Sequence, residues 1–461
     1  MVILLISALL ASAAFEPIGL WYFALIGYGL FFRGLSKSGR PVLASFLFGA
    51  ILNGIVLHWS SKYVGAFPWL LLTLLQAAFY LPVGWVYRKT NSLRWVLFTF
   101  LICEELRSRF PFGGFAWTRI AFSQVESPLL PIVSVGGVLL LSFATLLSAL
   151  ALNRLKIRAL ALVAVGFLII TFLPNNPATT EKISLIAIQG NTPSVGLEFN
   201  SRAKAVFYLH RDTTRKLVTQ KYDAVVWPEN AIDIDPRNYP EVLADIKTLV
   251  QEIDTPLIAG VVLTEQGSPA NASVMYDTSG QVQSSYIKRY LTPFGEYMPL
   301  RTISEIVSPY AKSVNDFKPG QRFVSHEIGG YKVAPIICYE IINDGLVRES
   351  ANNSGAIIVQ TNSATFANTA ESAQQLAITR IRAVEHSREI LSVSTVGISA
   401  FIDNNGQVKS QTPENISTSI SGDLKISNHR TLADRLGGVA PLLVLFTSLI
   451  LAIGIRKKVS R

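Results

Sequence analysis

Apolar residues are segregated along this chain into two end regions that flank a more polar middle. Long apolar runs occupy the sequence before Pro174 and return after Gly437, whereas the segment between them has the composition of an ordinary α/β domain. Half of the 461 residues are hydrophobic and only 16% are charged. This is too apolar for a soluble enzyme and too polar in the middle for a pure membrane bundle. We therefore expect a polytopic helical membrane domain joined to a globular domain.

The apolar runs are numerous enough to predict about eight transmembrane helices. Most approach the length needed to cross roughly 30 Å of hydrocarbon. The runs cover residues 2–14, 18–32, 42–57, 67–87, 93–106, 127–152, 159–173 and 438–455. Residues 1–174 would hold helices 1–7, and residues 437–461 would hold helix 8 and a basic cytoplasmic tail. The first run could also be a cleaved signal peptide, because Ala11-Ser-Ala13 resembles a signal-peptidase site. It lacks the basic residues with which signal peptides begin, so we favour a retained helix.

The basic residues predict which side of the membrane each segment faces. The segments expected inside carry Arg33, Lys37, Arg40, Arg88, Lys89, Arg94, Arg154, Lys156, Arg158, Arg456, Lys457, Lys458 and Arg461. The short loops expected outside carry Lys62, Arg107, Arg109 and Arg119. Thirteen against four is a positive-inside bias, which places residues 175–436 outside the cytoplasm. The net charge of +10 therefore reflects topology and does not indicate a nucleic-acid surface.

Two segments leave alternatives open. The stretch 107–117 combines arginines, glycines and aromatic residues, and is equally compatible with an interfacial aromatic belt and with a loop that binds lipid headgroups. Residues 297–313 mix Leu, Ile and Val with small polar residues. They are interpreted as a lid that touches the bilayer, and the alternative is an ordinary amphipathic surface segment.

The polar middle alternates between strand and helix patterns, which predicts an α/β sandwich with its own core. Strands are expected at 183–189, 223–227, 256–262, 333–337, 355–360 and 417–424, with a hairpin over 272–287 that turns at Thr278-Ser-Gly280 and two strands within 389–403. Helices are expected at 201–221, 239–253, 342–352 and 370–386.

Three of these predicted strands end on chemically active side chains. Cys338 follows an apolar run and precedes a predicted helix, whose N–H groups would favour the reactive thiolate. Glu229 and Lys288 end the other two strands. Together they could supply a nucleophile, a base and an oxyanion partner. Taken alone, Cys338 could instead be a buried structural cysteine; the only other cysteine, Cys103, lies in an apolar run, so a disulfide is not expected.

These residues carry a resemblance that covers nearly the whole chain. Trp227-Pro-Glu229, Lys288-Arg-Tyr-Leu-Thr-Pro-Phe-Gly-Glu-Tyr-Met-Pro299 and Cys338-Tyr-Glu340 resemble the signature of the nitrilase, or carbon–nitrogen hydrolase, superfamily. Gln189-Gly-Asn191 and Arg382-Ala-Val-Glu-His-Ser-Arg388 extend the likeness. With membrane helices on both sides of the domain, the match narrows to the apolipoprotein N-acyltransferase family. The resemblance implies an extracytoplasmic αββα sandwich.

The resemblance also implies a mechanism and its residues. Glu229 would be the base, Cys338 the nucleophile, and Lys288 with the Tyr339 N–H the oxyanion partner, while Glu296 and Glu340 would support this triad. The family transfers an acyl chain from a phospholipid, through a cysteine thioester, to the α-amine of an S-diacylglyceryl cysteine on a lipoprotein. It needs no metal or other cofactor and no nucleic acid, and it works in the bacterial plasma membrane. We expect a monomer.

The sequence departs from the commoner family pattern at two places, and two other functions stay open. Asn362-Ser-Ala-Thr-Phe366 stands where many members have Asn-Asp-Ala-Trp-Phe, and Thr395-Val-Gly397 stands where Asn-Thr-Gly is common. These differences bear on acyl and lipoprotein preference. A membrane-anchored amidase for a small amide is one alternative, although it would leave seven helices without a purpose. A non-catalytic lipid-binding module is the other, although the intact Glu, Lys and Cys argue against it.

Overall fold

The computed structural model describes residues 1–153, 179–195, 203–307, 309–312 and 314–454. The chain divides into two compact units, which we describe separately. The helical unit combines Met1–Asn175 with Thr431–Arg461, and the sandwich unit is Asn176–Arg430.

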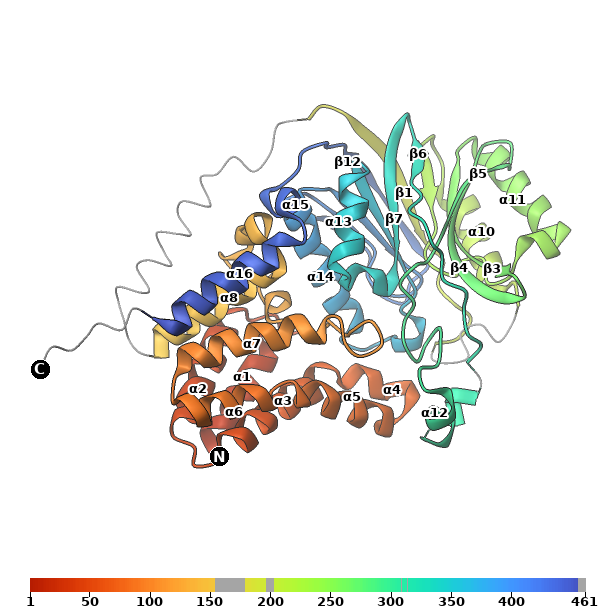
Figure 1. The fold of residues 1–461 in the computed structure, drawn as a ribbon. Coiled ribbons are helices and arrows are strands. Elements are labelled where there is room, and N and C mark those ends of the chain that lie inside the picture. The colour runs from red at the N-terminus through yellow and green to blue at the C-terminus, as the bar shows by residue number, and fades with distance from the viewer. Residues whose placement is uncertain (154–178, 196–202, 308, 313, 455–461) are drawn as a thin grey trace, which may run out of the picture. The chain divides into compact units, whose positions relative to one another are not determined.

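Each apolar run that the structure describes forms helix. The helices of this unit are α1 (Val2–Ala13), α2 (Tyr22–Ser36), α3 (Pro41–Val56), α4 (Ser61–Val64), α5 (Ala66–Ala78), α6 (Leu81–Thr90), α7 (Leu93–Arg107), α8 (Val133–Asn153), α15 (Leu432–Leu436) and α16 (Val439–Ile453), with short 3-10 turns at His58–Ser60, Ile120–Ser123 and Leu130–Ile132 (Figure 1). Within the described residues, two helical stretches are long and apolar enough to cross a membrane, Ala66–Thr90 and Leu130–Asn153. The run expected at 159–173 lies outside the described residues.

A cluster of aromatic rings forms the centre of the helical unit. Phe31 and Phe48 lie 4.3 Å apart between ring centroids, and Phe100 packs edge-on against Tyr28 at 5.7 Å and against Tyr80 at 5.2 Å. All five rings are buried. They come from α2, α3, α7 and the turn before α6, so the cluster joins helices that are distant in sequence.

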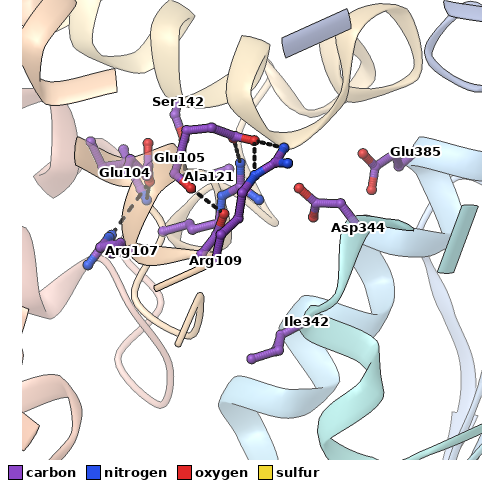
Figure 2. Close-up of polar contacts among 12 residues, drawn as sticks. Glu104, Glu105, Arg107, Arg109, Ala121, Ser142, Ile342, Asp344 and Glu385 are labelled. Carbon is purple, nitrogen blue, oxygen red and sulfur yellow. Dashed lines mark hydrogen bonds and ion pairs between the residues drawn. The ribbon is translucent and has the colours of Figure 1, made fainter. Parts of the chain in front are cut away.

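A group of charged side chains is also buried in this unit, where α7 meets the segment before α8 (Figure 2). Glu104 lies 3.6 Å from Arg107 and accepts the Ile120 N–H at 2.6 Å. Glu105 pairs with Arg119 at 3.4 Å and also with Arg109. Of the three arginines, only Arg109 has an exposed side chain. Glu104 therefore holds Arg107 inside the helical unit, and Glu105 holds Arg119 there. Both interpretations of residues 107–117, an aromatic belt and a headgroup-binding loop, stay predictions.

Removing one charge from this group should destabilise the helical unit. In a Glu104→Gln variant the amide can still accept from the Ile120 N–H, but the buried Arg107 loses its ionic partner. Breaking a buried pair in this way costs on the order of 3–5 kcal/mol. We expect a clearly lower thermal unfolding midpoint in detergent. Arg109→Gln is the matched control, and it should stay near wild type because exposed pairs contribute little. Equal midpoints for the two variants would contradict this.

The sandwich unit contains two six-stranded sheets among its described residues. The first has the order β12 (Thr418–Lys425), β1 (Lys182–Gln189), β2 (Ala224–Val226), β3 (Leu257–Glu265), β4 (Ser268–Tyr276) and β5 (Val282–Ile287). The second has the order β11 (Val408–Gln411), β10 (Ala400–Ile402), β9 (Ile390–Ser394), β8 (Ala356–Thr361), β7 (Tyr331–Ile337) and β6 (His326–Ile328). The centre of each sheet is parallel, because β1, β2 and β3 run together, as do β7, β8 and β9.

The alternation of side chains along the strands creates four layers. In β1, Leu185 and Ala187 enter the core between the two sheets, whereas Ile186 and Ile188 face the core under the outer helices. The helices α10 (Ala205–Leu217) and α11 (Pro240–Ile253) cover the first sheet, and α13 (Asp344–Asn352) and α14 (Glu371–His386) cover the second (Figure 1). The predicted αββα sandwich is therefore confirmed.

The expected elements of this unit are present, and two short strands were missed. The turn at Thr278-Ser-Gly280 is confirmed, since the Gly280 N–H bonds to the Asp277 carbonyl. The earlier hairpin between β3 and β4, which turns at Gln266-Gly267, was not expected as a hairpin. Strands β6 and β11 were also missed, because both are short, and β11 has a polar, largely exposed sequence.

Candidate active site

The three predicted active residues lie at strand ends of the sandwich unit and come together in space. Glu229 follows β2, Lys288 follows β5, and Cys338 follows β7. The Glu229 strand end approaches the neighbouring strand so closely that a Cβ on Gly260 would lie 2.3 Å from the Pro228 oxygen and 2.5 Å from Glu229 Cα. Glycine is therefore required at that position of β3. Glu229 and Cys338 are near enough for each to shift the pKa of the other.

The Lys288 ammonium is buried between two carboxylates. Its Nζ lies 3.2 Å from Glu229 Oε1 and 2.9 Å from the Glu296 carboxylate, and its side chain is 1% exposed. Burial would lower the pKa of Lys288, but the negative charges of Glu229 and Glu296 outweigh burial and raise it. The lysine is therefore a fixed cation, and Glu296 is its second counter-ion.

A further side chain of this group, Asn271 in β4, has no sequence signal that singles it out. Its Nδ2 donates to Glu229 Oε1 at 2.5 Å and to Glu296 Oε1 at 3.0 Å, and its own backbone carbonyl accepts from the Lys288 N–H. Asn271 thereby fixes both carboxylates relative to the lysine. Only the antiparallel pairing of β4 with β5 brings Asn271 to this site, so local sequence patterns do not identify it.

The Glu340 carboxylate links two strand ends through hydrogen bonds. One of its oxygens accepts from the Tyr286 hydroxyl at 2.8 Å and from the backbone N–H groups of Arg289 and Tyr290, at 2.7 and 3.1 Å. The other accepts from the Ile337 N–H at 2.9 Å. These bonds tie the chain after the lysine to the strand that carries the cysteine. Despite them, burial raises the pKa of Glu340.

The backbone at Cys338 turns sharply. Its φ is +49°, in the left-handed region that side chains other than glycine seldom adopt. The residues after it form a 3-10 turn over Cys338–Ile342 and not the start of a regular helix, which begins only at Asp344. Tyr339 stacks on Tyr290 with the ring centroids 5.7 Å apart. A strained turn at a strand end projects the thiol from the sheet and is frequent at functional sites.

The expectation of a stabilised thiolate is wrong. Burial and the negative charge of Glu229 raise the pKa of the Cys338 thiol well above its usual value, and the positive charge of Lys288 only partly offsets them. Glu371 and Glu296 raise it further. Cys338 is therefore a thiol at neutral pH, and its proton must leave as it reacts. Burial also raises the pKa of Glu229. This carboxylate therefore binds a proton more readily and can accept the one that leaves Cys338.

Two side chains of α14 contact Cys338 or the turn that begins with it. In α14, the Arg382 guanidinium donates to the Ile341 carbonyl at 3.0 Å and to the Ile342 carbonyl at 3.1 Å, at the end of the turn that begins with the cysteine. In the same helix, Gln375 Nε2 lies 3.8 Å from Cys338 Sγ.

The segment predicted as a lid carries exposed apolar side chains. It contains α12 (Arg301–Val307), and Leu300 and Ile306 are 62% and 83% exposed. Arg301 holds the segment together through bonds to the Val314 carbonyl and the Asp316 carboxylate.

The raised pKa of Cys338 predicts how its alkylation depends on pH. Since the thiolate is the reactive form, the rate constant for reaction with iodoacetamide should keep increasing beyond pH 9. A thiol near its ordinary pKa of about 8.5 would level off there. In Glu229→Gln the opposing charge is gone, so the same rise should move to lower pH. Peptide mass spectrometry separates Cys338 from Cys103, the buried internal control. A plateau below pH 8 in the wild-type protein would contradict the structure.

Known proteins match both parts of the chain. Residues 7–151 match the apolipoprotein N-acyltransferase N-terminal domain, and residues 185–434 match the carbon-nitrogen hydrolase domain. The chain is 30% identical over 448 residues to the apolipoprotein N-acyltransferase of Mycolicibacterium smegmatis. The matched region covers 87% of this chain and 75% of that protein. It is 27% identical over 443 residues to the enzyme of the same name from Pseudomonas syringae pv. tomato, with 88% and 87% covered.

Solved structures also resemble part of the chain. A carbon–nitrogen hydrolase superfamily protein from Xanthomonas campestris covers 60% of this chain and 98% of its own, with 16% identity and a TM-score of 0.41. An amidase from Nesterenkonia covers 53% and 91%, with 15% identity and a TM-score of 0.42. The two domain matches, in this order, and the extent of the likeness to the mycobacterial relative show that the chain belongs to the apolipoprotein N-acyltransferase family of carbon–nitrogen hydrolases.

Proposed function

We propose that this protein transfers an acyl chain from a membrane phospholipid to the N-terminal α-amine of an S-diacylglyceryl cysteine on lipoproteins, with Cys338 as nucleophile, Glu229 as base and Lys288 as oxyanion partner. The observation that carries the proposal is a carboxylate, that of Glu229, which lies 3.2 Å from a buried ammonium and near enough to the Cys338 thiol to raise its pKa. The names of the relatives supply the reaction.

The first step forms a thioester. Cys338 attacks an ester carbonyl of the phospholipid as its proton passes to Glu229, and the carbonyl oxygen becomes negative. Lys288 and the Tyr339 N–H would stabilise that oxygen. When the C–O bond breaks, Glu229 returns the proton to the departing lysophospholipid oxygen. The acyl chain is then held on sulfur, and no proton has been gained or lost.

The second step uses the same groups in reverse order. A neutral amine attacks the thioester, Glu229 takes a proton from the nitrogen, and the C–S bond breaks. Glu229 then passes the proton to sulfur, which restores the thiol and leaves an amide. The covalent intermediate lets the lysophospholipid leave before the second bulky lipid enters.

The lipid substrates require a site at a membrane surface. We extend the proposal to eight spans, both termini in the cytoplasm and the sandwich unit on the outer side, as the positive-inside bias predicts. The exposed apolar side chains at Leu300 and Ile306 fit a lid that contacts acyl chains and keeps water from the thioester. We propose that the enzyme works as a monomer in the bacterial plasma membrane.

A two-stage mass spectrometry experiment tests the reaction. Phospholipid alone should load one acyl group on Cys338 with release of lysophospholipid, and the diacylglyceryl peptide should then discharge it as an N-acyl amide. Acetylation of the peptide α-amine should block discharge without affecting loading, because no nucleophile remains. Cys338→Ala should abolish both stages. Transfer in the absence of any adduct would point to a ternary complex, and ammonia release from small amides would favour an amidase.

Reporter fusions test the orientation. A reporter fused after Arg461 should show a cytoplasmic location, and one inserted near Pro177 should show an external one. The basic residues of the proposed inner segments give the physical reason. If the reporter near Pro177 were cytoplasmic, the active site would face the wrong leaflet for lipoprotein substrates.

A further inference from the structure

A second carboxylate lies beside the nucleophile and has no role in the two steps above. Glu371 is in the first turn of α14, one helical turn before Gln375, whose amide lies 3.8 Å from Cys338 Sγ. Residues four apart share one face of a helix. Both side chains are buried, with Glu371 4% and Gln375 3% exposed. Glu371 is therefore on the face of α14 that contacts the active cysteine.

The Glu371 carboxylate has one oxygen available to a ligand. Oε2 has no hydrogen-bond partner among the described residues, although it is shielded from solvent. The hydroxyls of Ser363 and Ser372 are near enough to lower the pKa of this carboxyl. A buried carboxylate oxygen without a donor is unusual in a folded protein, because its desolvation is not compensated. A ligand with N–H donors would satisfy it.

The electrostatic surroundings of Glu371 suit proton exchange. The titratable groups that face it are Glu229, Glu414 and Cys338. Burial raises the pKa of Glu371 to about 7, and the charges of Glu229 and Glu414 contribute, while the two serine hydroxyls act in the opposite direction. At neutral pH it can therefore both accept and release a proton.

The second step of the proposed reaction leaves one proton without an acceptor. An α-amine has an ordinary pKa of about 7.7–8.0, so the acceptor arrives mainly as an ammonium. It must lose one proton to become a nucleophile and another as the N–C bond forms. Glu229 can take only the second, because it must be unprotonated at the moment of attack and must then return that proton to sulfur.

Resting on the proposed function, we infer that Glu371 binds the acceptor ammonium and removes its first proton. The ammonium donates to Oε2, and its proton passes to that oxygen. The neutral amine then attacks the thioester, its second proton passes through Glu229 to Cys338 Sγ, and Glu371 releases the first proton to water. This charge also selects an ammonium acceptor over uncharged water and alcohols at the loaded enzyme.

Single-turnover discharge of the loaded enzyme tests this role. Glu371→Gln should form the thioester from phospholipid no more slowly than wild type, because removing this charge only lowers the pKa of the Cys338 thiol. At pH 7, discharge by the diacylglyceryl peptide should be roughly six- to tenfold slower in the variant, because only that fraction of the amine is neutral without Glu371. The difference should vanish above about pH 9, where the amine is already neutral. Hydroxylamine, which is uncharged at pH 7, should discharge both proteins alike.

Two further variants provide the controls. Glu414→Gln removes a neighbouring charge but not the proton acceptor, so its discharge should stay fast at pH 7. The acid limb should move to lower pH, because the charge of Glu414 helps to raise the pKa of Glu371. Ser363→Ala removes a donor that favours the ionised form, which raises the pKa of Glu371 further and should shift the acid limb of discharge to higher pH. This variant also serves if Glu371→Gln does not fold.

The outcomes separate this inference from the function on which it rests. If phospholipid never loads wild-type Cys338, the proposed function fails. If loading is normal and Glu371→Gln discharges with the wild-type pH profile, only the role of Glu371 is overturned. Equal slowing of loading and discharge would also overturn it, because it would mean that Glu371 merely caps α14.

Discussion

The candidate active site depends on one buried ammonium, that of Lys288, held between the carboxylates of Glu229 and Glu296. Two negative charges around one positive charge leave the surroundings of the thiol with an excess of negative charge. Cys338 therefore keeps its proton until its sulfur attacks the carbonyl carbon of a substrate. In the proposed mechanism the thiolate forms only during attack on the substrate, which limits reactions with unrelated electrophiles while the site is empty.

The sandwich maintains this balance through hydrogen bonds between strands that are far apart in sequence. Asn271 fixes the two carboxylates from a neighbouring strand, and Glu340 ties the chain after the lysine to the strand that ends at the cysteine. Neither residue needs to touch a substrate. Both act by preventing the strand ends from separating, and a loss of about 1 Å in such alignment is costly for catalysis.

Local patterns predicted the triad and the sandwich because apolar strands that end on Glu229, Lys288 and Cys338 are visible in short windows of sequence. The partners of these residues could not be predicted in this way. Asn271 and Gln375 have ordinary local sequences, and only tertiary packing brings them to the site. The same limit explains why a stabilised thiolate was wrongly expected at Cys338. The sequence of one strand and the turn after it does not show the carboxylates that other elements bring close to the thiol.

The helical unit is discontinuous in sequence, since α16 packs on α7 and α8 and places Val444 in their common core. This arrangement dictates an order of assembly during synthesis. The ribosome must synthesise the whole sandwich unit before it makes α16, the helix that completes the core of the helical unit. Until then α7 and α8 present an unfilled face. A mutation that slows folding of the sandwich unit would therefore prolong the exposure of that face, so a defect in one unit would cause aggregation or degradation that begins in the other.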